Sequence, residues 1–329
     1  MAGLATSADD ILHFLLGRSR EGQGALLVTL VGIEGASPRA VGAQMAVAEN
    51  GEYIGSFSGG CIEAAVVAEA LEALSDAKAR TVRFGIGSPY LDIRLPCGGG
   101  IDLLFTPRPD QALIAATIEA LDARLPVAIS FRDFGIERQE QPVPTGWYGG
   151  SFVLAYTPRL RVVAIGQGEE LTAVARLAHA YGAYAIAFSP ARRDVASLHV
   201  NRVEAHFLPS RGARPSLLSD PWTAIIFLFH DRDWEDALIP WALALPRFYI
   251  GALGSKRSHA ARMDMLISGG LSPDAVSALR SPVGLIPSTR DPATLAVSIL
   301  AEIAQCYATD FSLGLSAEPE DCEAGLASG

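Results

Sequence analysis

One run of residues constrains the fold of this chain more than any other: RVVAIGQGEELTAVARLAHAYGAYAIAFSP, residues 161–190. It combines an apolar strand, a Gly-x-Gly turn, an amphipathic helix and a second apolar strand. Such a strand, apolar on both faces and leading through glycines into a helix, is typical of a parallel sheet with helices on both sides. We therefore expect a Rossmann-like doubly wound sheet, with further strands in 204–208, 223–231 and 247–254 and helices near 233–245, 255–268 and 292–307.

The preceding residues predict a different, α+β domain. A helix is expected at 7–21 and a strand at 25–33, then a hairpin around Asn50-Gly51, which is the strongest short hairpin signal. Helices near 62–79 and 110–122 and strands near 80–86, 126–133 and 151–156 complete it. We place the domains at 1–157 and 158–310, followed by an acidic tail, 311–329, which we expect to be disordered because it is acidic, lacks lysine and arginine and is rich in small residues.

Composition narrows the class of partner. A formal net charge of −10 argues against nucleic acid and anionic membranes as partners. The apolar runs are too short to span a bilayer, and no leader peptide is recognisable, so we expect a cytoplasmic protein without membrane association. The four cysteines show neither a C-x-x-C pair nor zinc-type spacing, which argues against a disulfide scaffold or a structural zinc.

Two cysteines lie in glycine-rich loops, SFSGGCIE (56–63) and LPCGGGIDLLF (95–105). Cys61 directly precedes a predicted helix, where backbone amides would stabilise a thiolate and favour a nucleophile or a soft-metal ligand. Burial as a small apolar side chain is the alternative for each cysteine. A Cys–His hydrolase would need the second domain, because no histidine lies between residues 14 and 178.

Three turns have the residues of an anion site. GASPRAVG (35–42) presents Ser37 and Arg39. A guanidinium can bind phosphate or carboxylate in a bidentate way, through two parallel hydrogen bonds. Amides at helix starts after Gly168 and Ser255 can also bind anions. Each turn also has a structural alternative. Residues 35–42 could form a surface β-turn, the Gly168 turn could be a tight strand-to-helix turn with acids in the first helical turn, and Ser255 could be a helix cap.

A dinucleotide site would also place an acid at the end of the second strand, about 20 residues after the glycines. The chain has Ser189-Pro190-Ala191-Arg192-Arg193 there, so a standard NAD site is disfavoured, although two arginines could meet a phosphate. His230 ends a predicted strand, where ligands bind in open α/β sheets. With Asp231 and Asp233 it could bind a cation or move a proton, or it could cap the next helix.

Together the motifs resemble the XdhC/CoxI family, accessory proteins for xanthine dehydrogenase and related molybdenum hydroxylases. The resemblance covers most of the chain from about residue 25 to 305. Its pieces are GASPRAVGAQMAV, GEYIGSFSGGCIEAAVVAEAL, LPCGGGIDLLF, VVAIGQGEELTAVARLAHAYG, FLFHDRDWEDALIPWAL, YIGALGSKRSHAARMDML and SPVGLIPSTRDPATLAVSILAEI. Glu169, Glu170 and Leu171 depart from the family's usual G-A-G-H-V-A turn.

The resemblance implies a chaperone without turnover of its own. It would bind the molybdenum cofactor, as molybdopterin or a dinucleotide form, while a cysteine desulfurase supplies sulfur, and then insert it into an apo molybdenum hydroxylase. A homodimer is also implied. Cys61 and Cys97 are the expected metal contacts, and either could instead accept the transferred sulfur. The full expected cofactor-binding set is Ser37, Arg39, Gly59, Gly60, Cys61, Glu63, Cys97, Gly98, Gly99, Gly166, Gly168, His230, Ser255, Lys256 and Arg257.

Two other functions remain open at this stage. The Rossmann-like half would suit an NAD(P)-dependent oxidoreductase, which cofactor titration would test. Alternatively, the chain could be a scaffold that binds a hydroxylase subunit and dimerises through its second domain.

Overall fold

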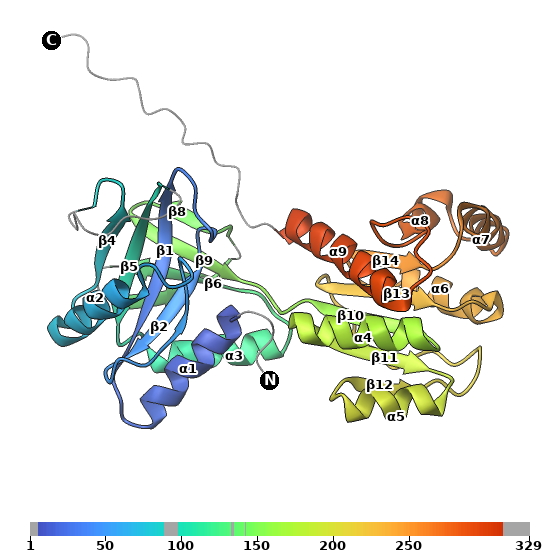
Figure 1. The fold of residues 1–329 in the computed structure, drawn as a ribbon, viewed down its shortest axis with the longest axis horizontal. Coiled ribbons are helices and arrows are strands. Elements are labelled where there is room, and N and C mark those ends of the chain that lie inside the picture. The colour runs from blue at the N-terminus through green and yellow to red at the C-terminus, as the bar shows by residue number, and fades with distance from the viewer. Residues whose placement is uncertain (1–5, 89–97, 133–134, 142, 312–329) are drawn as a thin grey trace, which may run out of the picture. The chain divides into compact units, whose positions relative to one another are not determined.

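The computed structural model describes residues 6–88, 98–132, 135–141 and 143–311. Its described part forms two compact units, an N-terminal unit (Thr6–Thr157) and a C-terminal unit (Pro158–Phe311) (Figure 1). No helix in these ranges is long and apolar enough to cross a membrane. The expected fold class, an α+β unit followed by a Rossmann-like parallel sheet, is confirmed.

Two antiparallel sheets build the N-terminal unit. The five-stranded sheet has the order β3-β2-β1-β5-β4, and the four-stranded sheet has the order β7-β6-β9-β8. The strands are β1 (Ala25–Glu34), β2 (Gln44–Ala48), β3 (Tyr53–Gly55), β4 (Arg80–Gly85), β5 (Gly100–Pro107), β6 (Val127–Arg132), β7 (Gly135–Arg138), β8 (Gly146–Tyr148) and β9 (Ser151–Tyr156). The predicted hairpin at Asn50-Gly51 is confirmed, since β2 and β3 pair with Ala46 opposite Ile54.

Alternation along β1 sends apolar side chains to two separate cores. Leu27 and Val31 face the core shared with α1 (Ala8–Arg20), α3 (Gln111–Asp122) and the four-stranded sheet. Leu26, Val28 and Leu30 face the core covered by α2 (Glu63–Asp76). A strand buried on both faces explains why its sequence is a continuous apolar run rather than an alternating one. β1 therefore stands at the centre of this unit, and its carboxyl end leads directly into the turn that contains Ser37 and Arg39.

The C-terminal unit is a six-stranded parallel sheet of order β12-β11-β10-β13-β14-β15, the strand order of a doubly wound dinucleotide-type fold. Helices α4 and α9 contribute to the core on one face, and α6 and α7 to the core on the other. The elements are β10 (Arg161–Gly166), α4 (Glu169–Tyr181), β11 (Tyr184–Ser189), α5 (Arg192–Val200), β12 (Glu204–Phe207), β13 (Thr223–Leu228), the 3-10 helix η1 (Arg232–Trp234), α6 (Glu235–Leu243), β14 (Tyr249–Ala252), α7 (Lys256–Ser268), α8 (Pro273–Ser277), β15 (Leu279–Arg280) and α9 (Pro292–Phe311).

Sequence patterns missed the short elements. β7 and β8 lie in or beside the polar stretch near 139–150 that was expected to be irregular, and β15 has only two residues. The most consequential omission is α5, since the sequence pattern predicts no helix where Arg192 and Arg193 lie. Short or polar segments show little periodicity of their own, and they become regular because neighbouring strands pair with them or cover them.

Candidate functional site

The loop that carries Cys61 joins β3 to α2 and depends on two glycines. Gly59 and Gly60 have φ of +75° and +119°, a region that side chains disfavour. No atom lies within 4 Å of a Cβ built at either position, so the backbone angles, rather than crowding, require glycine. The loop turns sharply enough to fold over the side chain of Glu63, in the first turn of α2.

Glu63 organises this loop. Its side chain is buried, with 3% of the residue exposed, and both carboxylate oxygens accept hydrogen bonds from the loop. Burial by itself would raise the pKa of Glu63, but the hydrogen bonds from Ser56 and Ser58 outweigh it and lower the pKa from 4.5 to about 2. The donors, at 2.6–3.2 Å, are the hydroxyls of Ser56 and Ser58 and the backbone amides of Phe57, Ser58, Gly60 and Ile62.

This network changes the interpretation of Glu63 and of the glycine amides. Glu63 was expected among the cofactor-binding residues, but its oxygens bind the protein's own backbone. The remaining loop amides are also engaged: Gly59 N–H donates to Ser56 Oγ at 2.9 Å, and Cys61 N–H to Ser58 Oγ at 3.0 Å. The amides predicted to stabilise an anion or a thiolate are therefore bound internally, and Cys61 is left exposed on the outside of the loop.

The turn with Ser37 and Arg39 contacts this loop. Ser37 Oγ donates to the carbonyl of Arg39 at 2.9 Å and accepts from its amide at 3.2 Å, which closes the turn. Arg39 Nε donates to the carbonyl of Ser56 at 3.0 Å, seventeen residues along the chain. Because Arg39 is exposed, this contact holds a guanidinium at the surface beside the loop of Cys61.

The second glycine loop packs against the same turn. A Cβ added to Gly99 would lie 2.5 Å from the carbonyl oxygen of Ala36 and 2.7 Å from that of Glu34, so only glycine allows this approach. Gly98 is exposed at φ +68°. Cys97 lies outside the described residues. The structure thus brings together three of the segments that the sequence predicted: Ser37 with Arg39, Gly59 to Cys61, and Gly98 with Gly99.

The Gly-x-Gly turn of the C-terminal unit also binds a carboxylate of the protein, that of Asp194 in α5. A Cβ at Gly166 would lie 2.3 Å from the carbonyl oxygen of Leu228, so this glycine permits close packing of β10 on β13. Gly168, with φ of +86°, donates its amide to Asp194 Oδ2 at 2.8 Å. Asp194 is 5% exposed and accepts a second hydrogen bond from Ser189 Oγ at 3.1 Å. The sequence has no acidic residue at the end of β11 itself. The structure places one nearby, Asp194, which comes from α5.

Neither arginine of the predicted phosphate pair faces that amide. Arg192 stacks its guanidinium over the ring of Phe207, 4.0 Å from the centroid. The Arg193 side chain is 85% exposed and lies 3.5 Å from Asp194 Oδ1. Asp194 lies in the first turn of a helix that the sequence pattern did not predict, and nothing in the sequence shows that it would reach residue 168.

His230 and its neighbouring acids do not gather around a common centre. His230 Nε2 lies 3.2 Å from Glu170 Oε1, whereas Asp231 and Asp233 both pair with Arg211. Within the described ranges, no group of three His, Cys, Asp or Glu side chains is arranged to hold a metal ion. Arg211 therefore provides the positive charge that the sequence interpretation had assigned to a bound cation.

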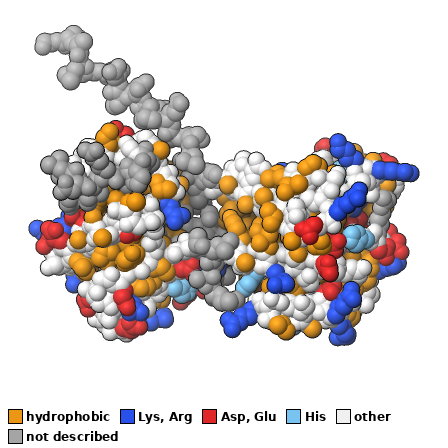
Figure 2. Space-filling model, in the orientation of Figure 1, with side chains coloured by type: hydrophobic (Ala, Val, Ile, Leu, Met, Phe, Trp, Pro, Cys, Tyr) orange, Lys and Arg blue, Asp and Glu red, His pale blue; other side chains and the backbone are white. Residues whose placement is uncertain are grey.

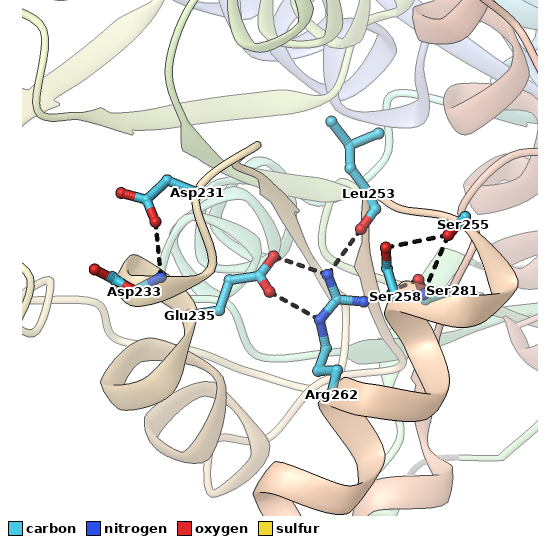
Figure 3. Close-up of polar contacts among 8 residues, drawn as sticks. All are labelled: Asp231, Asp233, Glu235, Leu253, Ser255, Ser258, Arg262 and Ser281. Atoms are coloured by element: carbon cyan, nitrogen blue, oxygen red, sulfur yellow. Dashed lines mark hydrogen bonds and ion pairs between the residues drawn. The ribbon is translucent and has the colours of Figure 1, made fainter.

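Ser255 caps α7 by accepting a hydrogen bond from the amide of Ser258 at 3.1 Å, and Lys256 and Arg257 are exposed. Behind them lies a buried ion pair that the sequence did not reveal. Arg262 donates to both carboxylate oxygens of Glu235, at 2.8 and 3.0 Å, and the side chains are 2% and 1% exposed (Figure 3).

The Arg262 guanidinium connects the ends of three strands. It also donates to the carbonyl of Leu253, after β14, at 2.8 Å and to Ser281 Oγ, after β15, at 3.0 Å (Figure 3). Since Glu235 follows β13, the pair fixes the loops at the carboxyl edge of β13, β14 and β15. This edge is where open α/β sheets bind ligands, and Lys256 and Arg257 are exposed beside it.

Comparisons with known proteins agree with this architecture. A model of the XdhC Rossmann domain matches residues 162–303, and a model of the XdhC and CoxI family matches residues 19–85. The molybdenum cofactor insertion chaperone PaoD of Escherichia coli (strain K12) is 36% identical over 314 residues, which cover 95% of this chain and 90% of PaoD.

Two more distant similarities were found. The uncharacterized protein YqeB of Escherichia coli (strain K12) is 24% identical over 285 residues, covering 85% of this chain but only 43% of YqeB. A crystal structure described as a xanthine dehydrogenase from Bacillus halodurans covers 95% of this chain and 98% of its own, with a TM-score of 0.75 and 22% identity. At that identity the likeness establishes the fold alone.

Proposed function

The chain belongs to the XdhC and CoxI family, and on that premise we propose that it binds the molybdenum cofactor and inserts it into a molybdenum hydroxylase of the xanthine dehydrogenase type. Its relative PaoD is named a molybdenum cofactor insertion chaperone. The proposal assigns no turnover of its own to the chain. We extend it to a cysteine desulfurase as sulfur donor, to a cytoplasmic location and to a homodimer.

One observation supports the proposal most directly: the Arg39–Ser56 contact places an exposed guanidinium and an exposed thiol on adjoining loops of the N-terminal unit. The cofactor, when bound, supplies a soft metal and an anionic phosphate. A thiol suits the first and a guanidinium the second. We therefore assign Cys61 to the metal end and Arg39, closed into its turn by Ser37, to the anionic end.

The other predicted residues receive different roles. Gly59, Gly60, Gly98 and Gly99 shape the loops, Glu63 positions Cys61, and Cys97 is kept as a candidate metal contact next to Gly98. In the C-terminal unit, Ser255, Lys256 and Arg257 are the residues we retain for an anion. Gly166, Gly168 and His230 are assigned to the packing of the sheet edge, because their groups contact Leu228, Asp194 and Glu170.

Retention of cofactor tests the assignment. The protein, produced in cells that make the molybdenum cofactor, should copurify with molybdenum and pterin, measured by elemental analysis and by fluorescence of the oxidised pterin. We expect Cys61→Ala to lower retained molybdenum about tenfold, in the range seen when metal-site residues are lost. Arg39→Ala should lower pterin and metal together, since an anion contact holds the whole molecule.

Cys306→Ala is the matched control, because the half-buried Cys306 thiol packs at the edge of the sheet core and should leave retention unchanged. Transfer is measured separately as activation of the apo hydroxylase by the loaded protein. A wild-type protein that retains neither pterin nor metal, or a Cys61→Ala variant that retains as much as wild type, would remove the basis of the proposal.

The alternative of an NAD(P)-dependent oxidoreductase is favoured by the strand order of the parallel sheet. The contact between Gly168 and Asp194 weighs against it, since a carboxylate lies where a dinucleotide's pyrophosphate would accept the same hydrogen bond. Calorimetric titration with NAD and NADP separates the two: micromolar binding would favour the oxidoreductase.

A further inference from the structure

One large aromatic side chain of the N-terminal unit is exposed and has no role assigned above. Trp147 lies in β8, an edge strand of the four-stranded sheet, and 53% of the residue is exposed. The other three tryptophans, Trp222, Trp234 and Trp241, belong to the C-terminal unit. Exposed apolar side chains are common on protein surfaces, as Figure 2 shows for one face of this chain, so exposure alone does not identify a binding residue. The contacts of Trp147 are what distinguish it.

Two contacts fix the indole ring of Trp147. Its Nε1–H donates a hydrogen bond to the carbonyl of Val31 at 3.0 Å. Across the ladder between β8 and β9 the ring meets that of the buried Phe152 edge to face, with centroids 5.6 Å apart and an interplanar angle of 68°. An edge-to-face contact covers at most one face of the indole, and more than half of the residue stays exposed. The ring is therefore presented in a set orientation, which lowers the entropy lost when a flat ligand binds.

The strand of Trp147 and its neighbour contact the segment that holds Arg39. Gly42 donates its amide to the carbonyl of Leu30 at 2.8 Å, so residues 31–41 connect the paired parts of β1 and β2. The acceptor of the Trp147 hydrogen bond is the first residue of this connection, and Figure 1 shows β8 next to β1. At the other end, a Cβ added to Gly42 would lie 2.8 Å from a side chain of β9. The β8–β9 hairpin therefore touches both ends of the connection that carries Arg39.

The molybdenum cofactor has three chemical parts, and two of them have an assigned contact. Cys61 is assigned to the metal and Arg39 to the anionic phosphate, which leaves the flat pterin ring. A pterin presents π faces, as a nucleobase does, and stacking of a base on an aromatic side chain contributes about 5- to 150-fold in affinity. We propose that the pterin ring stacks on the exposed indole of Trp147, a contact that presupposes the cofactor binding proposed above.

Retention of pterin by variants of the full chain tests the stacking contact. Each variant is produced in cells that make the cofactor, and bound pterin and molybdenum are measured. We expect Trp147→Leu, which removes the ring, to lower both about tenfold. Trp147→Phe keeps an aromatic ring but loses the hydrogen bond to Val31, and it should retain both within about threefold of wild type. Urea unfolding checks that the N-terminal unit of each variant is folded.

Tyr148, the next residue of β8, provides the matched control. It is 45% exposed, and its hydroxyl donates to the carbonyl of Pro144 at 3.1 Å. Because side chains alternate along a strand, Tyr148 projects from the opposite face of the sheet to Trp147. Tyr148→Leu removes a ring of similar exposure from the same strand and should leave retention of pterin and metal unchanged.

Removal of the metal separates the role of Trp147 from that of Cys61. In cells grown without molybdate, the chain should retain the pterin without its metal. Trp147→Leu should still lower retained pterin about tenfold, because the ring contact does not involve the metal. Cys61→Ala should then retain as much pterin as wild type. An effect of Trp147 that acted only through the Cys61 loop would disappear together with the metal.

A fluorescent probe reports the contact itself. An oxidised pterin that carries a phosphate is titrated into the full chain, and the pterin emission is followed. An indole in contact with an excited pterin quenches its emission by electron transfer, and a phenyl ring is a much weaker electron donor. The emission should therefore fall on binding to wild type and persist on binding to Trp147→Phe.

Four results would overturn the stacking contact: full retention by Trp147→Leu, an equal loss in Tyr148→Leu, a Trp147→Leu effect that vanishes without molybdate, or equal quenching by wild type and Trp147→Phe. A wild-type chain that retains neither pterin nor metal would instead remove the chaperone function, and the stacking contact with it. The two failures are therefore distinguishable in the same samples.

Discussion

The loop of Cys61 and the Gly166–Gly168 turn look alike in sequence, because each places glycines before a helix. In both, a carboxylate of the protein accepts the hydrogen bonds that an anion would have received. The difference lies in the number of donors: Glu63 accepts from six groups, whereas Asp194 accepts from the Gly168 amide and the Ser189 hydroxyl. The Cys61 loop therefore folds around the charge of Glu63, whereas Asp194 accepts fewer hydrogen bonds.

The carboxyl edge of the parallel sheet adds a third arrangement, in which Glu235 pairs with a full positive charge, Arg262. Six neutral donors therefore stabilise Glu63, two neutral donors stabilise Asp194, and a guanidinium stabilises Glu235. What they share is burial, and burial is what makes removal of a partner costly. Variants at these positions measure how the free energy of unfolding depends on the kind of partner.

The largest effect is expected at the ion pair. Arg262→Met leaves Glu235 buried without its partner and should lower the free energy of unfolding of the C-terminal unit by about 3–5 kcal/mol. Calorimetry of the full chain, followed by unit-specific hydrogen exchange, would measure it. Lys256→Met, at an exposed position of the same helix, is the control. A double variant, Arg262→Met with Glu235→Leu, should recover much of the loss, and a double variant as unstable as the single one would contradict this explanation.

The next effect concerns the Cys61 loop. Glu63→Gln keeps the shape of the side chain but removes the charge and turns one acceptor into a donor facing other donors. A pKa lowered from 4.5 to about 2 corresponds to a loss of about 3 kcal/mol in the stability of the N-terminal unit. Urea unfolding measures it. Glu72→Gln, on an exposed position of α2, should change stability little, and similar losses for both variants would refute the assigned role of Glu63.

Lowering the pH should reveal the contribution of the Glu63 charge to the free energy of unfolding. The folded state keeps Glu63 ionised down to a pKa of about 2, while the unfolded chain takes up a proton near 4.5, so the contribution is complete above that value and is lost as pH falls towards 2. Between about pH 5 and about pH 3 the wild-type N-terminal unit should lose about 2 kcal/mol that the Glu63→Gln variant does not lose. Equal acid sensitivity of the two proteins would place the titration elsewhere.

The smallest effect is expected at Asp194. Asp194→Asn retains an acceptor but weakens two hydrogen bonds from charge-assisted to neutral, a loss of about 1 kcal/mol. Titration with NADP provides the informative readout. The wild type should show no detectable binding, whereas the variant should bind NADP, because the negative charge beside the Gly168 amide no longer repels a phosphate. NADP binding to the wild type that equals binding to the variant would show that Asp194 does not exclude nucleotides.

Much of the fold could be predicted from the sequence. The apolar run of β10 with its glycines, the Asn50-Gly51 hairpin and the long amphipathic helices are all local signals, and the structure has them at nearly the expected residues. The short strands β7, β8 and β15 and the helix α5 were missed because pairing and packing, rather than their own periodicity, make them regular.

The candidate site was predictable only in part. The sequence singled out Ser37, Arg39 and Cys61, and the structure brings their loops into contact through Arg39 and Ser56. The role of Glu63 could not be anticipated, since an acid two residues after a cysteine gives no sign of whether it faces a ligand or the backbone. The Glu235–Arg262 pair was not foreseen, because its members lie on two helices twenty-seven residues apart.

By itself the sequence determined the two fold classes, the position of the glycines and the family, because each depends on patterns over neighbouring residues or on ordered motifs. Only the tertiary structure decided which acceptor each glycine-loop amide binds. A backbone amide in a protein interior must find an acceptor near 3 Å, and the candidate acceptors lie anywhere from two to tens of residues away. Asp194, twenty-six residues from Gly168, meets that amide only because β10 and β11 lie side by side in the sheet.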